Sequence, residues 1–251
     1  MDIKMIVSDL DGTLLREDKT ISLRTASVLR KCRDMGIKLV YATARGASAD
    51  QLTSSLEFDG RIRMNGAFAF AGDDQIYKRL LHTDEVREML LAFDAAGFGI
   101  VAENDGLHYS NIDYSKIWPE IKYMPADFNT LDIEIEKLYT IADRPEILPL
   151  MNKYLQPKHY IYVARDDMAM LMHIEATKSK ALAALAAHLG ILPGQIVAFG
   201  DDTNDLDMLQ YCGCGVVMAN GLGQAKAVAD EICDTNDNDG IAKWLEKRLS
   251  L

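Results

Sequence analysis

The chain has 251 residues, 49% of them hydrophobic and 26% charged, as in ordinary folded domains, so disorder is not expected. Its formal net charge of −11 argues against a nucleic-acid-binding or anionic-membrane-binding surface, because both depend on basic patches. The sequence shows no signal peptide, no apolar run of membrane-spanning length and no C-x-x-C pair among its four cysteines. We therefore expect a cytoplasmic protein with reduced cysteines, folded as one large or two modest domains and present as a monomer or small homo-oligomer.

The chain opens with a short apolar run, Lys4–Ser8, that ends in Asp9-Leu-Asp11-Gly-Thr. This pattern predicts a buried strand that delivers Asp9 to its carboxyl end, with both carboxylates leaving the same face. A hard divalent cation would neutralise two such acids, and Mg²⁺ is the usual choice beside phosphate. An Asx-rich turn that merely closes a strand is the alternative. A calcium loop of the EF-hand type is excluded, because Thr13 and Thr20 occupy two of its ligand positions.

The next segments alternate between strand and helix patterns. The alternation predicts a parallel sheet with right-handed crossovers, and such a sheet binds ligands at the carboxyl edge of its strands. The predicted elements are a helix over Ser22–Met35, a strand over Ile37–Ala42 ending in Thr43-Ala-Arg45, a helix over Ala47–Leu56, and a weaker strand over Ile62–Met64 ending at Asn65.

The regular alternation of strands and helices stops after a predicted hairpin over Phe68–Leu81. Between about Thr83 and Met172 a helix over Asp84–Ala96 is mixed with short strands, among them Gly99–Ala102, Lys137–Ala142 and Tyr160–Ala164. We interpret residues 83–172 as an α+β domain inserted into a core made of residues 1–82 and 173–251. Some of its side chains could contact a substrate, although aromatic residues in a small domain are usually its core; they are Tyr109, Tyr114, Trp118, Tyr123 and Arg165.

The α/β rhythm resumes after the insertion. The predicted elements are a helix over Ser179–Leu189, a strand over Ile196–Phe199 that ends in Gly-Asp201-Asp-Thr-Asn204-Asp205, strands over Cys214–Met218 and Glu231–Cys233, and a helix over Ile241–Leu249. The predicted fold class is α/β, with a Rossmann-like parallel-sheet core and an inserted α+β cap.

Polar side chains gather where four of these strands end. Asp9, Asp11, Asp201 and Asp205 supply carboxylates, Thr43 and Asn65 supply hydrogen bonds, and Arg45 and the lysines near Lys178 supply positive charge. One polar strand end can arise by chance, but four on one edge favour a site for a metal and a phosphate.

With these motifs the sequence resembles the haloacid dehalogenase-like (HAD) superfamily, specifically its Cof-type hydrolases with a large cap. The matching stretches are Asp9-Leu-Asp11-Gly-Thr-Leu, Thr43-Ala-Arg45, Asn65-Gly-Ala, Lys178, Gly200-Asp201-Asp-x-Asn204-Asp205, Val217-Met-Ala-Asn220 and Asp237-x-Asp239-Gly240. The family usually has Thr-Gly-Arg and Gly-Asn where this chain has Thr43-Ala-Arg and Ala219-Asn220. The likeness covers the whole core and is weak only in the cap.

The resemblance implies a Mg²⁺-dependent phosphatase acting on a small phosphorylated metabolite, such as a sugar phosphate, through an aspartyl-phosphate. Asp9 would be the nucleophile and Asp11 the acid and base, with a proton that moves near neutral pH. Mg²⁺ would be held by the Asp9 carboxylate, the Asp11 backbone carbonyl and Asp201, with Asp205 as a ligand or support. Thr43, Arg45, Asn65, Lys178 and Asn204 would bind substrate or phosphate. A phosphomutase and a non-catalytic Mg²⁺- or phosphate-binding regulator are the alternatives.

Two lysines compete for the phosphate-binding role. Thr177 is a plausible N-cap, which places Lys178 at the start of a helix and turns Lys180 elsewhere. The count back from Gly190-Ile191 also favours Lys178 in the family pattern, and a lysine there adds its charge to the positive end of the helix dipole. Lys180 stays open, because Ser179-Lys180-Ala181 is also typical of the family.

Overall fold

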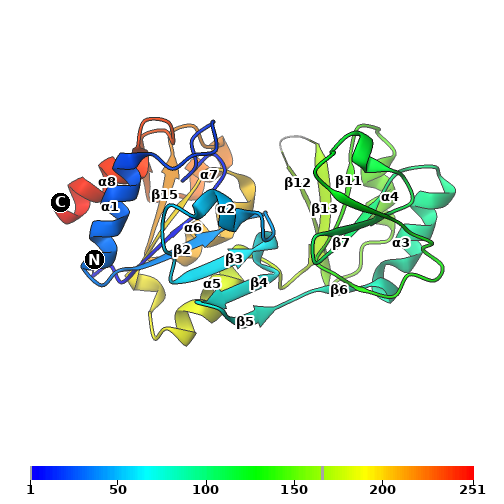
Figure 1. The fold of residues 1–251 in the computed structure, drawn as a ribbon, viewed down its shortest axis with the longest axis horizontal. Helices are drawn as coiled ribbons and strands as arrows, with labels where there is room; N and C mark the ends of the chain where they lie inside the picture. The colour runs from blue at the N-terminus through cyan, green and yellow to red at the C-terminus, as the bar shows by residue number, and fades with distance from the viewer. Residues whose placement is uncertain (1, 165–166) are drawn as a thin grey trace. The chain divides into compact units, whose positions relative to one another are not determined.

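The computed structural model describes residues 2–164 and 167–251 (Figure 1). They form two compact units: residues 1–78 with 177–251, called here the core unit, and residues 79–176, called here the cap unit. Arg165 lies outside the described residues. Within the described ranges, no helix is both long and apolar enough to cross a membrane.

The core unit is built on an eight-stranded sheet in the order β16-β15-β14-β1-β2-β3-β4-β5. Pairing is parallel from β16 to β3, and β4 and β5 add an antiparallel hairpin at one edge. The strands are β1 (Met5–Ser8), β2 (Lys38–Ala42), β3 (Gly60–Arg63), β4 (Phe68–Ala71), β5 (Asp74–Lys78), β14 (Ile196–Gly200), β15 (Cys214–Met218) and β16 (Glu231–Cys233).

Helices cover both faces of this sheet because its central strands are apolar on both sides. Ile6 of β1 packs in a cluster with α1 and α8, whereas its neighbours Met5 and Val7 pack on the other face with α5 and α6. The helices α1 and α8 lie side by side (Figure 1). The helices are α1 (Leu23–Asp34), α2 (Ala49–Thr53), α5 (Lys178–His188), α6 (Leu206–Tyr211), α7 (Gly223–Val228) and α8 (Gly240–Leu249).

Two predicted elements near the site differ in the structure. The helix predicted over Ala47–Leu56 is only α2, because the Ser54 hydroxyl donates to the Gln51 carbonyl and competes with continued helix. The strand predicted over Ile62–Met64 ends at Arg63 and continues as a 3-10 turn, η1 (Met64–Gly66).

The turn η1 folds back on the end of β2. The N–H groups of Met64 and Asn65 donate to the carbonyls of Arg45 and Thr43 at 3.0 and 2.9 Å. Both turn residues adopt a left-handed backbone, with φ of 49° and 51°. The loops after β2 and β3 are therefore tied together.

The cap unit is an α+β domain with a six-stranded mixed sheet in the order β12-β13-β11-β7-β8-β9. Leu138 and Leu171 of the sheet pack against Leu90 of α3 and Met151 of α4 in one apolar cluster. The bounds are β6 (Leu81–His82), α3 (Thr83–Ala95), β7 (Val101–Asn104), β8 (Leu107–Ser110), β9 (Lys122–Pro125), β10 (Glu134–Ile135), β11 (Lys137–Ile141), α4 (Ile147–Lys153), β12 (His159–Val163) and β13 (Met168–His173), with a 3-10 turn η2 (Tyr114–Lys116). The core unit has two further 3-10 turns among its described residues, η3 (Pro193–Gln195) and η4 (Thr203–Asp205).

Candidate active site

Three buried carboxylates meet at the carboxyl ends of β1 and β14, which are parallel neighbours in the sheet. Asp9 directly follows β1, and its N–H donates to the Phe199 carbonyl at 2.9 Å, continuing the pairing between the strands. Asp201 directly follows β14, and Asp205 ends the turn η4. One carboxylate oxygen from each of the three lies within 4.8 Å of the other two.

The Asp205 carboxylate is fixed by its neighbours. Its Oδ2 accepts from the N–H groups of Asp201 and Asp202 at 2.9 and 3.1 Å, and its Oδ1 accepts from Lys178 Nζ at 2.6 Å. Glycine is needed at position 200, because a Cβ there would lie 2.6 Å from the Asp205 Cβ. The turn after β14 thus holds one carboxylate in a single orientation.

Lys178 brings a positive charge into the same group. It is the first residue of α5, whose N-cap Thr177 accepts from the Lys180 N–H, so the predicted cap is present. The fully buried Lys178 Nζ donates to Asp9 Oδ1 and to Asp205 Oδ1, both at 2.6 Å. Burial alone would lower the pKa of Lys178, but the attraction of Asp205 and Asp9 raises it above its usual range. The ammonium is therefore charged. Lys180 is exposed.

This group fits a hard divalent cation. Burial raises the pKa of Asp9 well above its ordinary value; Lys178 opposes that rise, whereas the carboxylates of Asp205 and Asp201 add to it. With all three carboxylates ionised, the group has a formal charge of −2 once the ammonium is included. A divalent ion would balance that charge, and its oxygen ligands are already in place.

Asp11 points to a different set of partners. Arg45 donates to both of its carboxylate oxygens, at 2.6 and 2.8 Å, and Lys19 Nζ donates to Oδ1 at 2.7 Å. Burial opposes the shift, but these hydrogen bonds and charges lower the pKa of Asp11 to about 2. Asp11 is therefore ionised in this arrangement, and its predicted role as an acid stays a prediction.

Apart from Lys178 at the start of α5, the predicted phosphate-binding residues lie in three linked loops, which follow β2, β3 and β14. The buried Thr43 follows β2, and its hydroxyl accepts from the Arg45 N–H at 3.2 Å. Asn65 accepts from Asn204 Nδ2 at 2.9 Å, which joins the turn after β3 to the turn after β14. Arg45 holds the Asp11 carboxylate, and its role in binding phosphate stays a prediction.

Comparison with known proteins decides the family. A family model described as haloacid dehalogenase-like hydrolase matches residues 6–245. The chain belongs to this family. Two Bacillus subtilis (strain 168) relatives are named 5-amino-6-(5-phospho-D-ribitylamino)uracil phosphatases: YitU is 28% identical, over 98% of this chain and 98% of the relative, and YcsE is 30% identical, over 97% and 94%.

Solved structures of HAD phosphatases share the whole fold. BT1666 from Bacteroides thetaiotaomicron matches with a TM-score of 0.87 at 26% identity, over 99% of this chain and 96% of that chain. The sugar phosphatase BT4131 of HAD subclass IIB matches with a TM-score of 0.81 at 25% identity, over 98% and 99%. The predicted α/β fold with an inserted cap, and the predicted assignment to the capped phosphatases of this family, are therefore confirmed.

Sequence reasoning missed two side chains of this HAD hydrolase that touch the site. Thr13 donates to Asp201 Oδ1 at 2.8 Å. Its position two residues after Asp11 could have indicated this contact from the sequence. Lys19 reaches Asp11 because Lys19 lies in a tight turn with a φ of 63°. Nothing in the local sequence indicates that this turn brings the chain back to Asp11.

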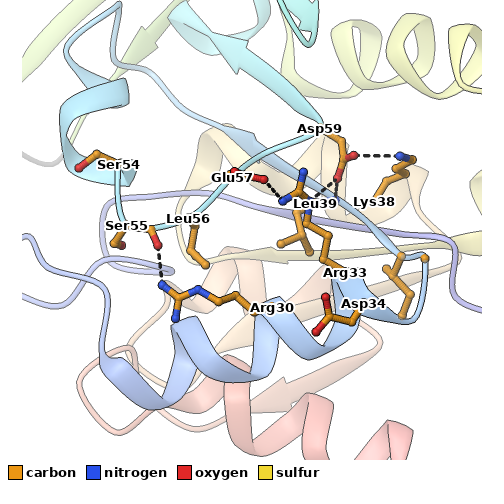
Figure 2. A pocket seen from close by; sticks show the side chains of 12 residues that line it. Arg30, Arg33, Asp34, Lys38, Leu39, Ser54, Ser55, Leu56, Glu57 and Asp59 are labelled. Atoms are coloured by element: carbon orange, nitrogen blue, oxygen red, sulfur yellow. Dashed lines mark hydrogen bonds and ion pairs between the residues drawn. The ribbon is translucent and has the colours of Figure 1, made fainter.

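A groove of about 740 Å³ lies at the other end of β2 from Thr43, between α1 and residues 54–59 (Figure 2). Figure 2 shows that Arg33 points toward Glu57 and Asp59 and that Lys38 points toward Asp59. The Lys38 Nζ donates to Asp59 Oδ1 at 2.9 Å. None of the predicted site residues is among the described residues that line it. We therefore do not assign the hydrolase site to this groove.

Proposed function

We propose that this HAD hydrolase is a Mg²⁺-dependent phosphatase that hydrolyses a small phosphorylated metabolite through an aspartyl-phosphate on Asp9. The observation that carries the proposal is the Asp9 carboxylate bound by Lys178 at 2.6 Å inside a buried group of acids. A nucleophile held in one orientation next to fixed positive charge is what in-line phosphoryl transfer requires.

In the proposed reaction Asp9 attacks the phosphorus, and the bond from phosphorus to the leaving oxygen breaks as the aspartyl-phosphate forms. The leaving oxygen takes its proton from Asp11. Asp11 then accepts a proton from the water that attacks the phosphorus, and the bond to Asp9 breaks with release of inorganic phosphate. Bound Mg²⁺ would supply positive charge beside the phosphoryl oxygens and would be held by Asp9, the Asp11 backbone carbonyl and Asp201, with Asp205 as a ligand or support.

The proposed role of Asp11 has two parts, donation of a proton to the leaving oxygen and acceptance of a proton from water, and its contacts support the second. The ionised carboxylate, held by Arg45 and Lys19, is the form that accepts a proton from water. As an acid, Asp11 must first gain a proton and weaken its contact with Arg45. We propose that substrate binding changes these partners, because a leaving oxygen competes for the same carboxylate.

Other residues are proposed to bind the transferred group. Lys178 would hold phosphoryl oxygens together with the Thr43 hydroxyl, and Asn204 would help from the turn after β14. Asn65 supports Asn204 through the bond between their side chains, and Arg45 supports Asp11.

The substrate class is proposed from the relatives. The names of YitU and YcsE specify a phosphorylated ribitylamino compound, and BT4131 is named a sugar phosphatase. A panel of sugar phosphates, polyol phosphates, pyridoxal phosphate and nucleotides, assayed with Mg²⁺ for release of inorganic phosphate, tests the proposal. Transfer of the phosphoryl group to another position of the sugar, without release of phosphate, would instead support the phosphomutase alternative.

The cap unit is proposed to select the substrate and to screen the reaction from water. The face of its sheet opposite α3 and α4 carries an ion pair between Lys137 and Glu103 at 3.0 Å, next to the Tyr139 ring. Polar groups held on such a face suit the recognition of hydroxyl groups on a metabolite.

The Glu103→Gln variant tests this role of the cap. We expect it to change the ranking of substrates in the panel while leaving the Mg²⁺ requirement as in wild type. Glu88→Gln, on α3, is the matched control and should keep the wild-type ranking. An unchanged ranking in the Glu103 variant would remove this residue from substrate selection.

A further inference from the structure

The loop that follows Asp11 is held by residues from the far end of the chain. Asn220 comes after β15, and its Nδ2 donates to the Gly12 carbonyl at 2.7 Å. Asn236 comes after β16, and its Nδ2 donates to the Leu15 carbonyl at 2.9 Å. Asn220 ends the motif Val217-Met-Ala-Asn220, and Asn236 directly precedes Asp237-x-Asp239-Gly240; the proposed reaction uses neither motif.

The contact from Asn220 acts on the peptide next to Asp11. Gly12 has a φ of 77°, and a Cβ on it would lie 2.6 Å from Asp201 Oδ2. The Gly12 backbone is therefore enclosed between a carboxylate of the acid group on one side and the Asn220 amide at its carbonyl. A shift of this peptide would move Asp11 and change its distance from a leaving oxygen.

Asn220 is itself oriented by the loop after β16. Its Oδ1 accepts from the Asn236 N–H at 3.2 Å, which leaves its Nδ2 directed at Gly12. The same loop binds further along the loop of Asp11: Asp239 accepts from Arg16 at 3.0 Å, and Asp237 accepts from the Glu17 N–H at 3.1 Å. Three loops that are distant in sequence thus form one hydrogen-bonded assembly.

The Asp239 backbone adds a second observation. This non-glycine residue has a φ of 57°, a left-handed conformation that costs free energy and persists only where its surroundings impose it. Its carboxylate lies between Arg16 and Thr25, with hydrogen bonds of 3.0 and 3.5 Å. The loop after β16 is therefore held in the shape that presents Asn236.

We propose that Asn220, oriented by Asn236, is a positioning residue for Asp11. The inference rests on the proposed role of Asp11 as the general acid. In this proposal Asn220 acts on Asp11 through the Gly12 carbonyl, to which it donates at 2.7 Å. Small displacements of a catalytic group can cost on the order of 10²-fold in rate.

The test compares two leaving groups. An alkyl phosphate needs a proton on its leaving oxygen, whereas p-nitrophenolate leaves with little help from an acid. In the Asn220→Ala variant we expect kcat on an alkyl phosphate to fall by on the order of 10²-fold, with kcat on p-nitrophenyl phosphate within about threefold of wild type and KM nearly unchanged on both. The Asn236→Ala variant should show a smaller loss with the same selectivity. Asn238→Ala, in the same loop, is the matched control and should behave as wild type.

Adding Asp11→Asn separates positioning from a general structural effect. If Asn220 acts through Asp11, removing Asn220 in the Asp11→Asn background should cause no further loss on the alkyl phosphate. Equal losses on both substrates, or additive losses in the double variant, would overturn the positioning role. A wild-type enzyme that hydrolyses neither substrate would refute the proposed phosphatase function itself, which is a separate outcome.

Discussion

Replacing Lys178 by Met removes the ammonium that the structure places between Asp9 and Asp205. Both N–O distances are 2.6 Å, and the side chain is fully buried. Removing one partner of a buried ion pair typically costs about 3–5 kcal/mol, a large part of the roughly 5–15 kcal/mol that stabilises a folded protein. Lys180→Met is the matched control. It changes an exposed residue, so its free energy of unfolding should stay within about 0.5 kcal/mol of wild type.

Mg²⁺ should partly rescue the Lys178 variant. Without the ammonium the three carboxylates carry a formal charge of −3 instead of −2, so a divalent cation stabilises the folded variant more than wild type. A ligand present at 100 times its dissociation constant stabilises by about 2.7 kcal/mol. The assay is urea unfolding followed by circular dichroism, in excess chelator and in saturating Mg²⁺.

The same two variants also decide which lysine serves the reaction. Under saturating Mg²⁺ we expect the Lys178 variant to lose orders of magnitude in turnover and the Lys180 variant to remain near wild type. Wild-type stability of the Lys178 variant in chelator, or loss of turnover in the Lys180 variant alone, would refute this account of the buried group.

Two further outcomes follow from backbone geometry and charge. Gly66→Ala should destabilise the fold by about 1–3 kcal/mol and lower turnover, because Gly66 has a φ of 102° and a Cβ there would collide with the Thr177 carbonyl beside Lys178. Urea unfolding measures the loss. Gly72→Ala is the control, because a Cβ at position 72 would meet none of the described residues within 4 Å. The pKa of Asp11 is lowered to about 2 in the folded state, so its contribution to stability is present above its ordinary value of 3.8 and is lost as the pH falls toward 2. Asp11→Asn should remove that part of the pH dependence of unfolding, and an unchanged acid limb would contradict it.

The carboxyl edge of the core sheet could be predicted from sequence because its signal is local. Each buried strand is an apolar run that stops at a polar group, and parallel pairing then brings Asp9 and Asp201 together without knowledge of side-chain contacts. The start of α5 was equally readable, since Thr177 caps it as its residue type predicts.

The partners of Asp11 could not be predicted in this way. The sequence predicts that Arg45 binds phosphate, and only the folded loop shows that its guanidinium donates hydrogen bonds to Asp11. Lys19 contacts Asp11 because its own backbone is left-handed, and Asn220 contacts Gly12 although 208 positions separate them in the sequence. Such contacts depend on loop conformation, which residue types fix only weakly.

The α+β class of the cap could be predicted from the sequence, but the positions of its strands could not. The strand β13 (Met168–His173) is almost continuously apolar, so it lacks the alternation that marks a half-buried strand. The predicted strand over Gly99–Ala102 is shifted to Val101–Asn104, where Val101 and Ala102 pack on opposite faces of the sheet.

We expect Asp9 to be phosphorylated during turnover. Rapid acid quenching of the enzyme with a ³²P-labelled substrate and Mg²⁺ should leave label on the peptide that contains Asp9. Asp9→Asn should keep the fold by circular dichroism, carry no label and release no phosphate, and wild type in excess chelator should be inactive. Undiminished phosphate release by Asp9→Asn, or full activity in chelator, would contradict the account.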